Sequence, residues 1–442
     1  MNPPTAFPLL SLLLAVPALG SLVCGLMGPK RPWAARLITS ICSWATLLLT
    51  LVTALLFLGS ESAAGIWESR NLIEMMGVNW ALGLDGFSLV LVCWAALAST
   101  VLLLFCAPFD RRSAIWILLA ESMALGLFLA RDAYLLLAFY GGLLVAIAPL
   151  AGARRRYLMF QLAGLALLFG FFVRCYQLVL VQTGIASTDL SRLQSLVLYP
   201  DEERTLFLVA FAGVAFALPV LPVSSWLSPL LESASRQGRL AVVALSSLAG
   251  SYLLFRLVLP ICKSGAFLSS ELVLTLAILT LGYGALAPGR PWARLVASHQ
   301  ALVLVGLFSF QELGVTGAAL QMLVLAAGLT GLALSNARAL LLFFTLFLTV
   351  APLLWVLPAQ WSHSRGFAAL ATLGFVMLSL RLWRETIARA REPAEPKRGL
   401  LLAIPVAFWC LSMIVLPGAW HDLLAPAARE VLPPNAVAEE ER

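Results

Sequence analysis

The sequence predicts an all-α, polytopic membrane protein, and three observations support this fold class. Of the 442 residues, 61% are hydrophobic and only 12% are charged, whereas about a quarter of the residues of an average soluble domain are charged. The mean hydropathy is strongly positive. The apolar residues also form repeated runs of roughly 20 residues, the length that a helix needs to cross a bilayer. A soluble enzyme and a disordered chain are therefore excluded.

Other classes of function find little support. The formal charge is +7, but no dense Lys/Arg stripe with interleaved aromatic residues indicates nucleic-acid binding. The seven cysteines are scattered without CxxC spacing, which argues against a disulfide framework and a metal site. The sequence shows no Ser-His-Asp set, phosphate loop or GxGxxG fingerprint. We expect no catalytic site, cofactor or metal, and we expect the first apolar run to be a retained span, because no basic segment precedes it.

About fourteen apolar runs are long enough to span a membrane. They lie near 7–27, 35–58, 85–107, 113–130, 132–151, 157–181, 205–225, 240–260, 270–287, 293–311, 315–335, 339–357, 367–384 and 399–418. With the N-terminus outside, the odd-numbered loops hold 19 Lys and Arg residues and the even-numbered loops hold 6. Since cytoplasmic loops are rich in Lys and Arg, we expect a multi-pass protein of a bacterial-type cytoplasmic membrane with both termini non-cytoplasmic.

Two of these runs carry paired prolines, which break helices. The first reads FALPVLPVSSWLSP and the second reads TVAPLLWVLPAQW. They are the seventh and twelfth spans, and this offset predicts two inverted five-helix repeats, spans 4–8 and 9–13, as in transporters. Two ordinary proline kinks are the alternative. We expect one transmembrane domain over 1–442, with N-terminal spans at 1–110, the first repeat at 111–260, the second at 261–384, and a basic loop with the last span at 385–442.

Seven segments, in order, resemble one family of membrane subunits. They are GLDGFSLVLV at 83–92, FLARDAYLLLAFY at 128–140, PVLPVSSWL at 219–227, GSYLLFR at 250–256, ASHQALVLVGLF at 297–308, TGAALQML at 316–323 and LPGAWHDLLAPA at 416–427. Through them the chain resembles the antiporter-like membrane subunits of respiratory complex I, closest to the M-type and N-type chains. Related chains occur in Mrp-type antiporters, membrane-bound hydrogenases and inorganic-carbon uptake complexes. The lateral helix of the L-type subunit is missing.

In that family, a line of charges at mid-membrane carries ions. A Glu in helix five pairs with a Lys in broken helix seven, a second Lys lies in helix eight, a further acid or Lys lies in helix twelve, and a His lies in helix eleven. At the matching positions this chain has Gly141, Ala217, Leu248 and Leu325, and its twelfth span, 341–356, has no ionisable residue. The His of the Pro-x-x-Pro-x-His motif is Ser224. The signature of the fold is kept while the titratable groups are replaced.

A few ionisable residues remain at membrane depth. Glu121 and Arg174 lie inside spans, and they could form a charge pair that fixes helices four and six, or a residual ion path. Arg174 could also snorkel to an interface. His299 could be a hydrogen-bonded core residue or a proton carrier.

Others lie near span ends. We expect Asp85, Arg131 and Asp132 to be solvated, and Glu232 to form a local ion pair with Arg236 or Arg239. Asp132 and Glu232 join Glu121, Arg174 and His299 as candidates for an ion path. Ser246 and Ser247 could hold water near the replaced Lys or ease helix packing.

The leading interpretation is a membrane-arm subunit of a complex I-like (NADH:quinone oxidoreductase or hydrogenase-type) assembly. We expect it to contact the lipid bilayer and sister membrane subunits, and to be structural because the pumping charges are replaced. One alternative is a transporter or channel with a rewired path. Another is the membrane partner of a catalytic subunit in inorganic-carbon uptake.

Overall fold

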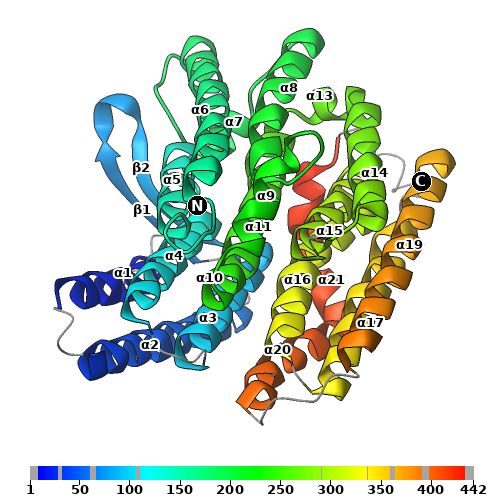
Figure 1. Cartoon of the computed structure of the whole chain (residues 1–442). Coiled ribbons are helices and arrows are strands. Elements are labelled where there is room, and N and C mark those ends of the chain that lie inside the picture. Colours follow the sequence, from blue (N-terminus) through cyan, green and yellow to red (C-terminus); the bar gives the residue numbers. More distant parts are fainter. Residues whose placement is uncertain are drawn as a thin grey trace. The chain divides into compact units, whose positions relative to one another are not determined.

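The fold was examined in a computed structural model, which describes residues 8–27, 32–59, 66–105, 110–289, 291–335, 337–358, 364–390 and 398–433. It is almost entirely helical (Figure 1). Each of the fourteen predicted ranges contains helix within its described residues. Within the described residues, nine helices are long and apolar enough to cross a membrane, or up to ten if a bent pair is one span. The protein is therefore a multi-pass membrane protein, and the count of fourteen stays a prediction.

The chain forms two compact units. Unit 1 comprises Met1–Leu198 and Ser233–Tyr252, and unit 2 comprises Tyr199–Glu232 and Leu253–Arg442. The helices and strands that begin in unit 1 are α1 (Leu9–Leu26), α2 (Pro32–Leu58), β1 (Ile66–Ile73), η1 (Glu74–Met76), β2 (Val78–Leu84), α3 (Gly86–Phe105), α4 (Arg111–Leu129), α5 (Ala133–Ile147), α6 (Arg154–Thr183), α7 (Leu190–Gln194), α10 (Arg236–Ala241), the π-helical η3 (Val242–Ser246) and α11 (Ser247–Leu253).

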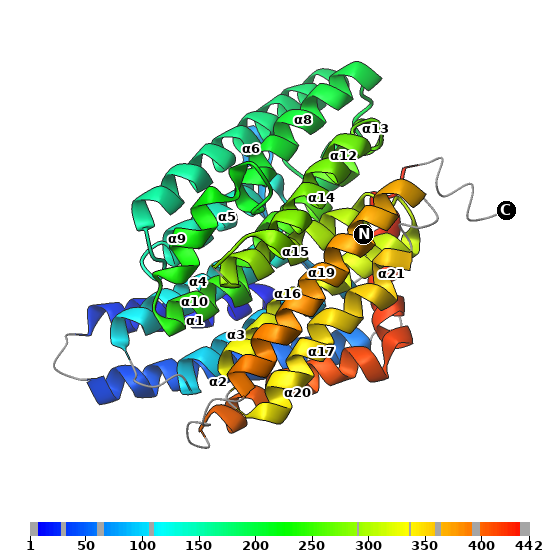
Figure 2. The ribbon, with the colours of Figure 1, turned by 45° about the vertical axis from the view of Figure 1, so that its right-hand side comes forward.

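Unit 2 holds the remaining elements. They are α8 (Pro200–Ala217), η2 (Val223–Trp226), α9 (Leu227–Glu232), the π-helical η4 (Leu254–Val258), α12 (Leu259–Ile261), α13 (Lys263–Leu268), α14 (Ser270–Leu286), α15 (Pro291–Leu307), α16 (Glu312–Leu334), α17 (Arg338–Trp355), α19 (Arg365–Ala390), α20 (Arg398–Val415) and α21 (Pro417–Val431). In Figure 2, α17 lies between α19 and α20, and it contacts both.

Unit 1 contains a β-hairpin that hydropathy does not predict. β1 and β2 pair antiparallel beside α5 (Figure 1). Gly77, in the turn between them, has φ +64°, and a Cβ there would lie 2.0 Å from the carbonyl oxygen of Ala186. The turn therefore needs glycine both for its backbone conformation and for its close approach to the chain before α7.

The core of unit 1 is built around Tyr252, the tyrosine of the GSYLLFR segment. Its hydroxyl donates to the carbonyl of Phe128 at 2.8 Å. Its ring stacks on Phe87 with centroids 5.7 Å apart and meets Phe128 edge-on at 5.1 Å. One motif residue thus joins α3, α4 and α11, which explains why a tyrosine in this segment belongs to the fold.

The first predicted helix break is present. α8 ends at Ala217 and helical structure resumes at Val223. A freed backbone donor at the break is satisfied, because Leu221 N donates to Thr280 Oγ1 of α14 at 3.0 Å, as membrane depth requires.

In the twelfth span, α17 runs through Pro352 to Trp355. Residues 359–363, which follow Pro358, lie outside the described part. The second break and the inverted repeat stay predictions.

Candidate functional site

The four positions at which the resemblance predicts titratable residues hold leucine, glycine or alanine. Leu248 of α11 and Leu325 of α16 are both 0% exposed. Gly141 lies in α5, where a Cβ would approach Leu165 Cδ2 to 3.4 Å. Ala217 is the last residue of α8, directly before the helix break. None of these four side chains can bind or release a proton.

A neutral hydrogen bond lies beside the replaced glutamate. Tyr140, the neighbour of Gly141, donates through its buried hydroxyl to Gln161 Oε1 of α6 at 2.9 Å. Phenol and amide form this contact without any net charge. The bond therefore fixes α5 against α6 where the family uses an ionisable side chain.

Glu121 of α4 is fully buried, with 0% exposure. Neither carboxyl oxygen has a hydrogen-bond partner among the described residues. The next residue, Ser122, donates to the carbonyl of Leu14 on α1 at 2.9 Å, so this stretch of α4 packs against α1. An unpaired buried carboxylate is costly, so Glu121 must be either protonated or met by water.

The charge pair expected between Glu121 and Arg174 is not formed. Arg174 is exposed on α6, while Glu121 has no polar partner. At about 1.5 Å per residue, Arg174 lies roughly 27 Å along α6 from Arg156. That separation is close to the hydrocarbon thickness of about 30 Å, so the snorkelling interpretation agrees with the geometry.

The expectation of solvated span ends is wrong for Arg131 and Asp132, which are 9% and 0% exposed. Asp132 caps α5 through the backbone N–H groups of Tyr134 and Leu135, at 3.0 and 3.2 Å. It also accepts from Asn79 N at 3.1 Å and from the hydroxyl of Thr188. Burial nevertheless outweighs these bonds and raises the pKa of Asp132. Its contacts are those of a structural cap, because they join β2, α5 and the segment before α7.

Asp85 and Arg131 form an ion pair at 2.9 Å. The Arg131 guanidinium also lies 5.4 Å from the centre of the Trp67 ring and donates through Nε to the carbonyl of Gly83 at 3.2 Å. Burial opposes ionisation of Asp85, but Arg131 and hydrogen bonds from Ser88 outweigh it and lower the pKa of this carboxyl. The hairpin thus covers Arg131, which hydropathy could not show, while the Asp85 side chain stays 31% exposed.

His299 lies in unit 2 and has the contacts of a core residue. It is 1% exposed, and its Nδ1 lies 2.8 Å from Gln321 Nε2 of α16. Gln321 Oε1 and the hydroxyl of the adjacent Ser298 are buried without a hydrogen-bond partner. The pair connects α15 to α16 through neutral groups.

Glu232 is exposed at the end of α9, where unit 2 meets the next segment in sequence. Its ion pair with Arg236 or Arg239 stays a prediction. The structure therefore places Glu121, Arg174 and Asp132 in unit 1 and Glu232 and His299 in unit 2. Within each unit, no hydrogen bond or ion pair between described residues joins these candidates. Among the described residues, no three His, Cys, Asp or Glu side chains come together as a metal site would require.

Three charged residues at or near the ends of predicted spans form a cluster around the buried Arg294. Arg294 of α15 is 3% exposed and pairs with Glu385 of α19 at 2.7 Å. Arg381 donates to the same carboxyl oxygen at 3.2 Å. Sequence distance hid this cluster, because Arg294 lies on α15 while Arg381 and Glu385 lie on α19.

Comparison with known sequences gives several homologues, although no family model matches the chain. Chain 4 of the NAD(P)H-quinone oxidoreductase of Picosynechococcus sp. is 28% identical over 346 residues, which are 72% of this chain and 62% of that one. Subunit M of the F420H2 dehydrogenase of Methanosarcina mazei is 28% identical, covering 71% and 68%. Subunit M of the NADH-quinone oxidoreductase of Pseudomonas aeruginosa is 27% identical, covering 73% and 69%. The match thus spans less than two thirds of the cyanobacterial relative.

Solved structures share the fold. A chain of respiratory complex I from Thermus thermophilus has a TM-score of 0.82 at 22% identity, covering 96% of this chain and all of that one. A chain of the Mrp complex from a Dietzia species has a TM-score of 0.77 at 16% identity, covering 96% of this chain and 52% of that one. A chain of the archaeal membrane-bound sulfane sulfur reductase has a TM-score of 0.78 at 15% identity, covering 97% of this chain and 99% of that one. The resemblance predicted from the motifs is confirmed: the homologues of this chain are chain 4 and subunit M of quinone- and F420H2-linked oxidoreductases, and its fold is that of the antiporter-like membrane subunits of complex I and Mrp.

Proposed function

We propose that this chain is a membrane-arm subunit of a complex I-like assembly in a bacterial-type cytoplasmic membrane, and that it supports sister membrane subunits without pumping ions itself. One observation carries the proposal: Leu248, where the family has a lysine in helix eight, is completely buried. A leucine there can neither titrate nor pair with a carboxylate. The relatives' names and the fold favour the assembly, and the replaced charges favour the structural role.

The loops that meet within each unit support the proposed topology. At one end of unit 1, Arg131 N donates to Ala81 O, and Thr188 N donates to Gly77 O; all of these residues belong to loops predicted outside. At the other end, Arg111 Nε donates at 3.0 Å to the carbonyl of Cys24 in the last turn of α1; Arg111 belongs to a loop predicted inside, and the loop that follows α1 is also predicted inside. This segregation agrees with the alternation of basic loops and with non-cytoplasmic termini.

A native pull-down in mild detergent with mass spectrometry tests the assembly. We expect sister membrane subunits to be recovered together with hydrogenase-like or NADH-oxidising subunits. Recovery of a single large zinc-containing partner would favour inorganic-carbon uptake instead. Recovery of the chain alone would contradict both assemblies.

Proteoliposomes test the structural role separately. The purified chain should not collapse an imposed proton gradient faster than empty liposomes do. Combined restoration of Glu at Gly141 and Lys at Ala217 and Leu248 should leave partner recovery intact and transport by the assembly unchanged. Proton flux through the native chain would contradict the proposal.

A second candidate function, a rewired ion path, is favoured only by the unpartnered carboxyl of Glu121. It requires that Glu121→Gln abolish flux while the protein still folds. Glu74→Gln is the matched control, because Glu74 is exposed on the hairpin. Equal ion flux through the Glu121→Gln and Glu74→Gln variants would reject the path.

A further inference from the structure

Two arginines share one carboxyl oxygen in unit 2. Arg294 NH2 lies 2.7 Å from Glu385 Oε1, and Arg381 Nε lies 3.2 Å from the same atom. The side chains of Arg294 and Arg381 are only 3% and 26% exposed. The cluster therefore holds two positive charges against one negative charge. Arg294 is buried, where charges are normally paired, whereas the Glu385 side chain is 36% exposed.

The remaining hydrogen bonds compensate only part of this charge. Arg294 NH1 donates to Ala287 O at 3.3 Å, and Arg381 NH1 donates to Ala285 O at 3.0 Å. These carbonyls end α14, where the helix dipole contributes about half a negative charge. Arg294 Nε stays buried without a hydrogen-bond partner. A bound anion would balance the remaining positive charge of the cluster.

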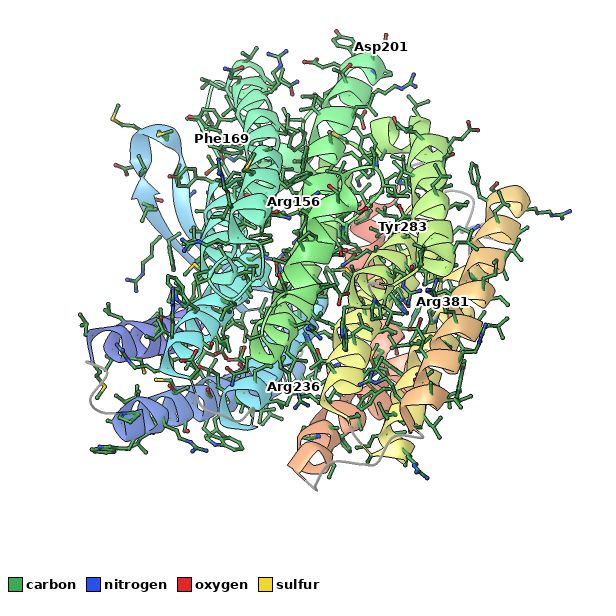
Figure 3. All side chains as sticks on the ribbon, in the orientation of Figure 1. Arg156, Phe169, Asp201, Arg236, Tyr283 and Arg381 are labelled. Carbon is green, nitrogen blue, oxygen red and sulfur yellow. The ribbon has the colours of Figure 1, made fainter. Side chains whose placement is uncertain are left out.

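Two further polar groups lie at the same end of α14 and α19. Arg384 follows Arg381 by one turn; it is exposed and makes no ion pair with any described side chain. Tyr283 is 39% exposed and lies two residues before the carbonyl that Arg381 binds. Figure 3 labels Tyr283 and Arg381 on these neighbouring helices. Tyrosine is typical of membrane interfaces, where its ring is apolar and its hydroxyl is hydrated.

Exposed apolar side chains run from these groups along both helices. On α19 they recur every three or four residues, at Leu380, Met377, Leu373 and Leu370. On α14 they are Leu286, Leu279 and Leu272. α14 and α19 pack against each other. A ligand that matches this surface has an anionic head and long apolar chains.

We propose that Arg381, Arg384 and Tyr283 bind the phosphate headgroup of an anionic phospholipid whose acyl chains lie along the exposed faces of α14 and α19. Basic pockets between helices are known to hold such headgroups. Inorganic phosphate shares the headgroup chemistry but would leave the apolar faces unused, so the surface favours the lipid. The site is independent of the proposed function, since it requires neither a partner subunit nor ion transport.

Lipid titration of the purified full chain in detergent tests the site. Cardiolipin and phosphatidylglycerol should be retained in native mass spectra and raise the melting temperature more than phosphatidylcholine does. Arg384→Gln should weaken this binding by about fivefold, since each arginine near an anionic surface contributes about 1 kcal/mol. The fold should tolerate the change, because Arg384 forms no ion pair with another residue of the described part of the chain. Arg389→Gln is the matched control: Arg389 is exposed on α19, but about 140° around the helix from Arg384.

Three outcomes would overturn the proposal. One is equal lipid binding by Arg384→Gln and Arg389→Gln. Another is a rise in melting temperature with millimolar inorganic phosphate that equals the rise with the lipid. The third comes from a photo-crosslinking residue at Leu380 in native membranes: we expect an adduct with the mass of a phospholipid, and a polypeptide adduct would show that a protein covers this face.

Discussion

Arg131 NH2 lies 2.9 Å from Asp85 Oδ2, so the segment that enters α5 is tied to the residue that precedes α3. Asp85 also accepts from Ser88 N in the first turn of α3, at 2.8 Å. One carboxylate thus caps a helix and pairs with a mostly buried arginine.

This pair makes stability depend on pH. The pKa of Asp85 is lowered below its ordinary 3.8, so the stability it contributes is present above that value and is lost as the pH falls through the lower folded pKa. Asp85→Asn should reduce the melting temperature at about pH 6 and make its decline toward about pH 3 shallower. Asp201→Asn, at an exposed site (Figure 3), should keep the wild-type slope. Parallel slopes for all three proteins would refute the linkage.

The hairpin also fastens α1. Glu68 of β1 accepts from Ser11 N at 3.0 Å and from Ser11 Oγ at 2.6 Å, in the first turn of a helix with no side-chain cap of its own. Glu68→Ala should lower the free energy of unfolding by about 1–3 kcal/mol, because buried donors lose their acceptor. Glu74→Ala, an exposed change on the same hairpin, should alter it by less than about 0.5 kcal/mol. Denaturation in detergent measures the free energy of unfolding of both variants. Equal losses of this free energy would contradict the capping role of Glu68.

The same substitution should have opposite effects at two buried glutamates. Glu121 has no hydrogen-bond partner, so Glu121→Met should raise the free energy of unfolding by about 1 kcal/mol or more. Glu203 accepts from Ser264 N and Gly265 N at 2.6 and 3.1 Å, so Glu203→Met should lower it by about 1–3 kcal/mol. Thermal unfolding of both variants gives the comparison. A destabilised Glu121→Met would reveal a partner for that carboxyl.

Gly284 and Ser298 should be energetically coupled. A Cβ at Gly284 would lie 1.7 Å from Ser298 Oγ, so Gly284→Ala should cost about 1–3 kcal/mol through overpacking. Ser298→Ala should be nearly neutral, because its hydroxyl has no partner. The double variant should recover much of the loss of Gly284→Ala in a double-mutant cycle. Simple additivity would show that the clash is relieved elsewhere.

Hydropathy predicts the helices of this chain well because each span is a local property of about 20 residues. The predicted range 113–130 corresponds to α4 at Arg111–Leu129, and 315–335 corresponds to α16 at Glu312–Leu334. The predicted ends of the helices are less accurate where a helix extends beyond its apolar run. α19, for example, continues to Ala390 through charged residues that the pattern places in a loop.

The hairpin could not be predicted in this way. β1 has one buried residue, Glu68, among exposed or half-buried ones, so it lacks the alternation that marks a half-buried strand. The stabilising contacts of the hairpin come from α1 and from the segment near Thr188, which are both distant from it in sequence. Arg131 and Asp132 are buried through their own contacts with the hairpin, at Trp67, Gly83 and Asn79, and for that reason sequence alone suggested solvated ends.

Within the candidate site, residue identities could be predicted but pairings could not. The replacements at Gly141 and Leu248 follow directly from motif spacing. Whether Glu121 meets Arg174 depends on how α4 and α6 are rotated, which no local pattern determines. The cluster of Arg294, Arg381 and Glu385 likewise depends on how α15 packs against α19.

The contact between Glu68 and α1 also constrains biosynthesis. The acceptor for Leu10 N lies 58 residues further along the chain, so α1 leaves the ribosome before its cap has been translated. α1 and α2 must insert and bring the hairpin back to the side where α1 begins before the first turn of α1 can be secured. A nascent chain arrested shortly after α2 should therefore hold α1 in the bilayer with a frayed first turn, and translation of the hairpin would complete it.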